Sequence, residues 1–148
     1  MPVSQNGYIA CDISRTRLWK IRGTDTYVRL RRGAPGRLLW ELASWFHGNV
    51  EPIDQGQRDD WGYAERQIRD SRVWSNHSSG TAIDLNALKH PMGKRGTFTD
   101  RQQRAIQRWL SDHDGCVRWG GNYRGRPDEM HFEIAASVEA CRRALYGS

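Results

Sequence analysis

Residues 74–86 read WSNHSSGTAIDLN, and this stretch decides the fold around it. A polar segment containing His77 leads to Gly80, where a turn is expected, and an apolar run over 82–85 follows as a short buried strand. Asp84 lies inside this apolar run. A carboxylate is costly to bury unless a cation or strong hydrogen-bond donors face it, so Asp84 is the first candidate for a functional site.

A second polar segment, residues 118–133, contains the other candidate groups. His131 begins an expected strand, and Asp128 lies three residues earlier on the preceding turn. Together with His77 and Asp84, His131 completes the three protein ligands of a catalytic zinc that keeps its fourth position for water. Asp128 would then be close enough to accept a proton from that water. The residues alone leave a second interpretation open, in which the three groups are separate buried polar side chains.

The rest of the chain predicts one α+β domain, in which a small antiparallel β-sheet is flanked by helices. A length of 148 residues corresponds to a single domain over 1–148. Further strands are expected over 17–22, 27–31, 117–119 and 131–134. Three helices are also expected. The first runs from residue 38 to a stop at Gly48, the second begins with a capping box of Thr99 and Gln102, and the third begins at Ser137.

Composition excludes several classes of protein. Charged residues make up 27% of the chain and recur every few positions, so no run of roughly 18–20 apolar residues could span a membrane. Seven Trp, five Tyr and three Phe argue against a disordered chain. The net charge of +6 comes mainly from arginines scattered along the sequence, without a nucleic-acid docking motif. We therefore expect no nucleic-acid partner, although a basic surface that attracts DNA or an anionic wall polymer stays open.

The cysteines and the N-terminal residues indicate the cellular compartment in which the protein is made. Cys11, Cys116 and Cys141 are an odd number without Cys-x-x-Cys spacing, so a disulfide framework is not expected. The first residues lack a basic segment followed by an apolar one, so no secretory signal is visible. We expect synthesis in a cytoplasm, and action outside the cell would need a separate means of release.

The pattern Ser75-x-His77-x-x-Gly80-x-Ala82-x-Asp84, followed later by Asp128-x-x-His131, resembles the signature of a zinc peptidase group. This group contains D-alanyl-D-alanine carboxypeptidases and L-alanyl-D-glutamate endopeptidases, and its structural relatives include lysostaphin-type enzymes and the hedgehog signalling domain. The resemblance implies a hedgehog-like peptidase fold. The stretches 60–64, 75–86, 93–98 and 119–133 also resemble the peptidase domain of phage endolysins, particularly those that attack actinobacterial walls.

The resemblance implies roles for particular residues. His77, Asp84 and His131 fall on the zinc ligands of the family. Asp128 falls on its general base, where many members have Glu, so the shorter side chain must approach the metal more closely. Ser75 matches a position beside the substrate. Family members also use an upstream arginine to polarise the scissile carbonyl; Arg66 is our choice, with Arg69 as its rival.

Two further residues are candidates from their positions. Glu133 shares a strand face with His131 and is a candidate acceptor for its second imidazole nitrogen. Trp119 is a candidate substrate contact, although an aromatic residue at such a place is more often part of the core.

The implied function is a zinc-dependent peptidase of bacterial peptidoglycan, of the phage endolysin type. It would hydrolyse an L-alanyl-D-glutamate or D-alanyl-D-alanine bond of the stem peptide, as a monomer, after release from the host cytoplasm. The alternative is a catalytically inactive, zinc-containing module that binds the wall or a protein. The acid at Asp128 argues for the enzyme, because a binding module has no need of a carboxylate beside an open metal position.

Overall fold

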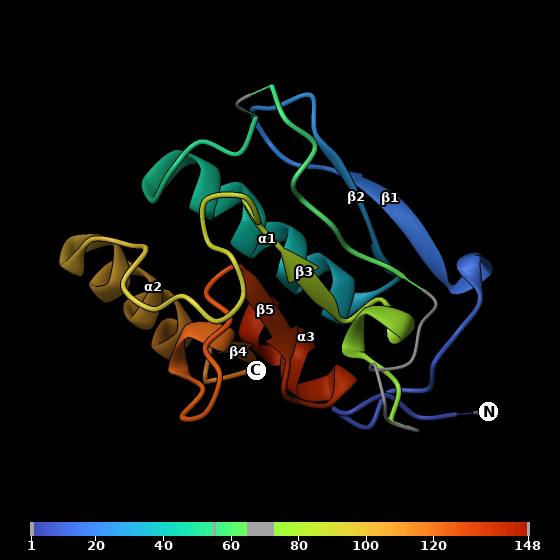
Figure 1. Ribbon diagram of the computed structural model, residues 1–148. Coiled ribbons are helices and arrows are strands. Elements are labelled where there is room, and N and C mark those ends of the chain that lie inside the picture. The colour runs from blue at the N-terminus through green and yellow to red at the C-terminus, as the bar shows by residue number, and fades with distance from the viewer. Residues whose placement is uncertain (1, 55, 65–72, 148) are drawn as a thin grey trace.

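A computed structural model of the protein describes residues 2–54, 56–64 and 73–147. Within these residues the architecture is α+β, as expected, with three α-helices and two small antiparallel sheets (Figure 1). The helices are α1 (Ala34–Asn49), α2 (Asp100–Asp112) and α3 (Val138–Tyr146). The strands are β1 (Thr16–Lys20), β2 (Tyr27–Arg31), β3 (Ala82–Asp84), β4 (Val117–Trp119) and β5 (His131–Ile134). Three short 3-10 helices are η1 (Ile13–Arg15), η2 (Asn76–Ser79) and η3 (Gly120–Asn122).

The two sheets differ in how far apart their strands lie in the sequence. β1 and β2 form a hairpin in which Leu18 lies opposite Arg29. In the other sheet the order is β3-β5-β4, so the last strand of the chain lies in the middle. Phe132 of β5 lies opposite both Ile83 of β3 and Trp119 of β4. This central strand therefore brings the two polar segments of the sequence together.

Helix ends follow the expected local signals except in α1. Thr99 caps α2, with its Oγ1 accepting from the Gln102 N–H and the Gln102 side chain accepting from Thr99, which confirms the capping box. α1 begins earlier than expected, because Pro35 lies in its first turn, where the missing N–H costs no hydrogen bond. It also continues past Gly48, since the Val50 N–H still donates to the Phe46 carbonyl at 2.8 Å.

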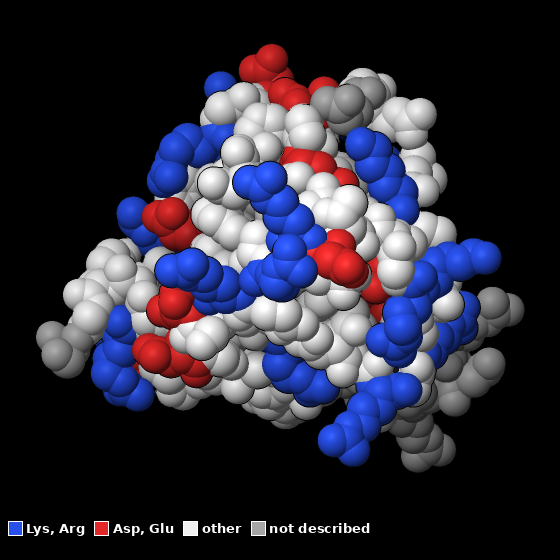
Figure 2. Space-filling view, turned by 90° about the vertical axis from the view of Figure 1, so that its left-hand side faces the viewer, with Lys and Arg blue, Asp and Glu red and all other residues white. Residues whose placement is uncertain are grey.

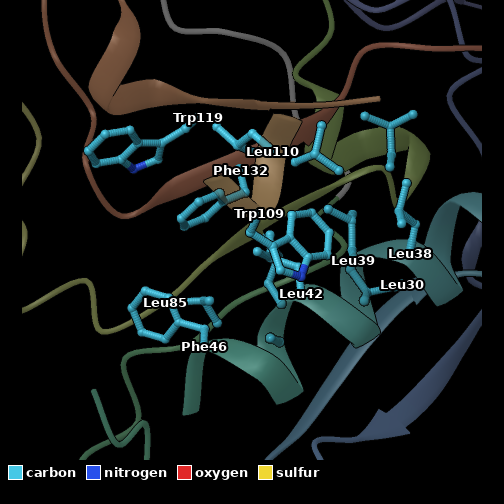
Figure 3. Packing of buried hydrophobic residues seen from close by; sticks show 14 of the residues in the cluster. Leu30, Leu38, Leu39, Leu42, Phe46, Leu85, Trp109, Leu110, Trp119 and Phe132 are labelled. Atoms are coloured by element: carbon cyan, nitrogen blue, oxygen red, sulfur yellow. The ribbon is translucent and has the colours of Figure 1, made fainter. Parts of the chain in front are cut away.

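The core lies between α1 and the sheets. Leu42 and Phe46 of α1 belong to one buried cluster with Ile83 and Phe132, and the Phe46 and Phe132 rings meet edge to face with centroids 6.2 Å apart (Figure 3). The cluster draws residues from Trp19 of β1 to Cys141 of α3, which are buried together. The apolar face of the three-stranded sheet is thus covered, and its other face is left for polar groups.

The surface carries charges of both signs. Figure 2 shows basic side chains at several separate places on one face, with acidic side chains between them. None of the helices in the described part of the chain has the length and apolarity to cross a membrane.

Replacing Phe46 by alanine should strongly destabilise the protein. Its side chain is fully buried and contacts the rings of both Phe98 and Phe132, so the substitution leaves a cavity between α1 and the sheet. We expect the free energy of unfolding to fall by about 3–5 kcal/mol in urea denaturation. Leu88→Ala, at a side chain that is 65% exposed, should change it by less than about 0.5 kcal/mol. Equal effects of the two substitutions would contradict this description of the core.

Candidate metal centre

His77 is positioned by a short turn of 3-10 helix. The Ser75 side chain caps η2 by accepting a hydrogen bond from the His77 N–H at 3.1 Å. The helix ends at Gly80 in the left-handed conformation, with φ of 69°. A Cβ at this glycine would lie 2.6 Å from the backbone nitrogen of Arg31, so only glycine allows this close approach to β2. The chain then enters β3 with the His77 side chain facing Asp84.

Strand pairing brings Asp84 and His131 together. The two residues lie directly opposite each other in the β3–β5 ladder, so their side chains share one face of the sheet. Their neighbours Ile83 and Phe132 point the other way, into the core. The expected alternation of the strands therefore places both polar side chains on the face away from α1.

The three groups predicted as metal ligands form one compact cluster. Asp84 Oδ2 lies 3.2 Å from His77 Nε2, and Asp84 Oδ1 lies 3.0 Å from His131 Nδ1. One potential ligand atom from each residue lies within 4.8 Å of the others. All three residues are buried, with exposed fractions of 4%, 8% and 9% for His77, Asp84 and His131. The structure thus joins residues that the sequence keeps far apart.

The second nitrogen of each imidazole is held by an acceptor. His77 Nδ1 lies 2.7 Å from the carbonyl oxygen of Gly62, and His131 Nε2 lies 2.7 Å from Oε1 of Glu133. Because these oxygens only accept, each of the two nitrogens donates its proton outward. The remaining nitrogens, His77 Nε2 and His131 Nδ1, therefore face Asp84 with the atoms that would bind a metal. The contact expected between Glu133 and His131 is present.

The charges of the cluster are strongly coupled. Burial disfavours the imidazolium of His131, but its hydrogen bonds with Asp84 and Glu133 outweigh burial and raise its pKa to about 10. Burial would raise the pKa of Asp84, but hydrogen bonds with His131 and His77 hold it well below its usual range. Without a metal, the proton on His131 Nδ1 faces the Asp84 carboxylate. Two nitrogens and one carboxylate oxygen, each turned inward, fit a divalent ion such as zinc that can take the place of such a proton.

Asp128 lies near this cluster, and one of its carboxylate oxygens makes no hydrogen bond with the described residues. Its residue is only 9% exposed, and Oδ1 is buried without a hydrogen-bond partner among the described residues. Burial raises the pKa of the Asp128 carboxyl, while the nearby imidazole of His131 lowers it and the charge of Asp84 raises it further. A buried acceptor without a partner is costly, so this oxygen is suited to a ligand or water that occupies the site.

The turn that bears Asp128 is held by several hydrogen bonds. The Asp128 N–H donates to the Gly120 carbonyl at 3.0 Å, and the Trp119 indole N–H donates to the carbonyl of Glu129 at 2.8 Å. The Glu129 carboxylate accepts from the backbone N–H groups of Gly96 at 3.0 Å and Thr97 at 2.8 Å. These contacts hold the backbone of the turn that carries the Asp128 side chain.

The other predicted site residues lie in different places. Trp119 is 2% exposed and stacks on Phe132, so the structure places it in the core, where it supports the Asp128 turn instead of offering a surface to a substrate. Ser75 serves as the cap of η2. Arg66 and Arg69 lie outside the described residues.

Two groups near the cluster were not predicted from the sequence. The Gly62 carbonyl orients His77, and a backbone acceptor leaves no signal in a sequence. The Tyr123 hydroxyl donates to Glu133 Oε1, the oxygen that also binds His131. Burial, followed by this bond to Glu133, raises the pKa of the Tyr123 hydroxyl well above its usual range. Tyr123 precedes His131 in an irregular segment, so no periodicity links the two residues.

Asp60 binds the backbone of the residues that follow β3. Its Oδ1 accepts from the Asn86 N–H at 2.8 Å, where Asn86 adopts a left-handed conformation with φ of 49°. Burial raises the pKa of the Asp60 carboxyl to about 7 although the hydrogen bond from the Asn86 N–H lowers it, and the charges of Asp59, Asp54 and Glu51 act in the same direction as burial.

Taken together, the α+β fold and the cluster define a small unit with a candidate metal site, whose three potential ligands are of the kind found in metal-dependent hydrolases. Residues 69–134 match the model of a peptidase family described as D-alanyl-D-alanine carboxypeptidase. This match confirms the family resemblance drawn from the sequence. It covers a little under half of the chain and includes His77, Asp84, Asp128 and His131. No curated protein and no solved structure gives a significant match to the chain.

Asp60→Asn should change how stability depends on pH. Because the pKa of Asp60 is raised in the folded state, the parent loses stability as pH rises from about 4 to the folded value of about 7. The variant keeps an oxygen for the Asn86 N–H but has no proton to lose. Its free energy of unfolding should therefore rise relative to the parent, by up to about 1.4 kcal/mol per pH unit across this window.

Denaturation curves between pH 4 and 8 measure this difference. Asp112→Asn, which removes an exposed carboxylate, serves as the control and should follow the parent. A difference between Asp60→Asn and the parent that stays constant over the whole range would show that Asp60 is not the titrating group.

Proposed function

We propose that the protein is a zinc-dependent peptidase that hydrolyses a bond in the stem peptide of bacterial peptidoglycan. The observation that carries the proposal is the convergence of His77, Asp84 and His131 within 4.8 Å, in a segment that matches a D-alanyl-D-alanine carboxypeptidase family. Beside this cluster, Oδ1 of Asp128 is buried without a hydrogen-bond partner in the described part of the chain, which adds an acid–base group to the candidate ligands.

The residues present would hold zinc through His77 Nε2, His131 Nδ1 and a carboxylate oxygen of Asp84. When bound, zinc supplies Lewis acidity, which polarises a peptide carbonyl and lowers the pKa of a water molecule. Glu133 and the Gly62 carbonyl keep the two imidazoles in the tautomers that turn their free nitrogens inward. The protein would thus supply a buried set of three ligands for the metal.

In this proposal Asp128 is the general base and acid. Its carboxylate accepts a proton from the attacking water and returns that proton to the leaving amine. The raised pKa of its carboxyl brings the group nearer to the pH at which it must both accept and donate. The hydrogen bonds that hold the Gly120 and Glu129 backbone bring this short side chain close to the cluster, where many family members have the longer Glu.

The broader assignments follow from the same resemblance. We propose a single hedgehog-like peptidase domain over 1–148, which the continuous core from Trp19 to Cys141 supports. We also propose a monomer that acts as a phage endolysin on the wall. Arg66, or Arg69 in its place, would polarise the scissile carbonyl, and Ser75 would lie beside the substrate.

Substitutions at two positions should separate metal binding from catalysis. Asp128→Ala should retain zinc but lose hydrolysis by about 100- to 10,000-fold, the usual contribution of general acid–base catalysis. His77→Ala should lose both, because it removes a ligand. Zinc content is measured by elemental mass spectrometry, and hydrolysis by the release of new amines from purified peptidoglycan.

The control is Asp112→Ala, which removes an exposed carboxylate on α2. Muropeptide mass spectrometry of the parent digest identifies the bond that is cut. Near-parent rates for Asp128→Ala would refute its role as the base. A parent protein that binds zinc but releases no amines would instead support the inactive binding module.

A further inference from the structure

The segment 56–64 joins the two sheets beside the metal cluster. Figure 1 shows it running between β2 and β3. On one side the Tyr63 N–H donates to the Arg29 carbonyl at 2.6 Å. On the other side Trp61 and Asp84 exchange two backbone hydrogen bonds, at 2.9 Å and 2.8 Å. A Cβ on Gly62 would lie 2.1 Å from the Arg29 carbonyl oxygen, so the glycine permits this close packing.

These pairings place Trp61 on the same face as the candidate metal ligands. Trp61 lies directly opposite Asp84 in an antiparallel bridge, and Asp84 lies directly opposite His131. Residues that face each other in this way have side chains on one side of the sheet, with Cβ atoms about 4.5–5.5 Å apart. Trp61 is 51% exposed, in contrast to the buried residues beside it. Trp61 therefore adds a half-exposed aromatic residue to the face that carries the cluster.

A groove extends from Trp61 along the strands β1 and β2. Its volume is about 450 Å³, within the range of small-molecule sites. Leu18 and Tyr27, which are 50% and 55% exposed, line it together with Trp61, and Arg29 and Arg58 supply polar groups. Large apolar side chains gathered in one groove and rimmed by charges are typical of a ligand-binding surface.

We propose that this groove binds the glycan strand to which the stem peptide is attached; the proposal rests on the proposed function. A sugar ring has an apolar face of C–H groups and an edge of hydroxyls. The rings of Trp61 and Tyr27 offer the matching apolar faces, and the guanidinium groups of Arg29 and Arg58 can donate to the hydroxyls. The groove therefore suits a saccharide.

The backbone of the groove favours a sugar over a peptide. An extended peptide usually binds by adding a strand to a free sheet edge. Here both backbone groups of Trp61 are already bonded to Asp84, and the Tyr63 N–H is bonded to Arg29. The groove thus presents side chains instead of an open edge at this point.

The position of the groove also bears on the bond that is cut. The L-alanyl-D-glutamate bond is the stem-peptide bond one residue from the sugar. The D-alanyl-D-alanine bond lies three residues further on, up to about 10 Å in an extended chain. Since Trp61 is the direct neighbour of Asp84, a sugar on Trp61 places the nearer bond at the metal cluster. The proposal therefore expects cleavage of the L-alanyl-D-glutamate bond.

Binding to glycan without peptide tests the proposal directly. The probe is soluble peptidoglycan glycan strands from which an amidase has removed the stem peptides, titrated into the intact protein and followed by tryptophan fluorescence and calorimetry. The parent should bind, and Trp61→Ala and Tyr27→Ala should each weaken binding at least tenfold. Trp61→Phe, which keeps an aromatic face, should retain most of the affinity. Leu88→Ala removes an exposed leucine outside the groove and should bind like the parent.

Kinetics on two substrates separate a glycan contact from a peptide contact. For Trp61→Ala, KM on intact wall should rise, and the loss of kcat/KM on wall should exceed the loss on free stem peptide by at least about fivefold. Equal losses on both substrates, unaltered glycan binding by the variants, or cleavage at D-alanyl-D-alanine would overturn the proposal. Glycan binding needs no turnover, so a parent that binds glycan without hydrolysing it would refute the proposed function and leave the groove assignment intact. Circular dichroism of each variant verifies that it is folded.

Discussion

The carboxylate of Asp84 is buried between two imidazoles, and the candidate site depends on this arrangement. One oxygen faces His77 and the other faces His131, at 3.2 Å and 3.0 Å. A buried charge without such partners would cost roughly several kcal/mol, so both the turn of η2 and the pairing of β3 with β5 are needed to satisfy the Asp84 carboxylate. The same geometry directs the free nitrogen of each imidazole inward. The contacts that satisfy the buried carboxylate therefore also bring the three candidate metal ligands together.

A second set of contacts holds the acid that would work beside the metal. Trp119 and the Gly120 carbonyl bind the backbone around Asp128, and Glu129 ties this turn to the loop at Thr97. The indole bond is buried and the bonds of Glu129 are half-buried, and together they hold the backbone of this turn in place. Asp128 is thereby kept near the cluster while one of its oxygens stays unpartnered among the described residues.

The face of the sheet that carries the site extends beyond the three ligands. Trp61 continues the row of Asp84 and His131 across one more pairing, toward the hairpin of β1 and β2. The opposite face is filled by the core against α1. Because strand residues alternate between two faces, one sheet serves both as the support of the core and as the floor of the candidate substrate site.

The sequence alone determined those features that arise over a few residues. The alternation in β1 and β2, the capping box at Thr99, and a buried acid within the apolar run at Asp84 are all local. Residue types and spacing also made His77, His131 and Asp128 candidates, and the family motif supported their roles. Tertiary structure decided what distant segments do to one another: Asp84 meets His131 across 47 residues, Trp119 is buried, and Trp61 joins the face of the site. Side-chain periodicity assigns a residue to a face but not to a partner. Which residues become neighbours is decided when the core assembles, because only then is the free energy of burying one segment against another gained.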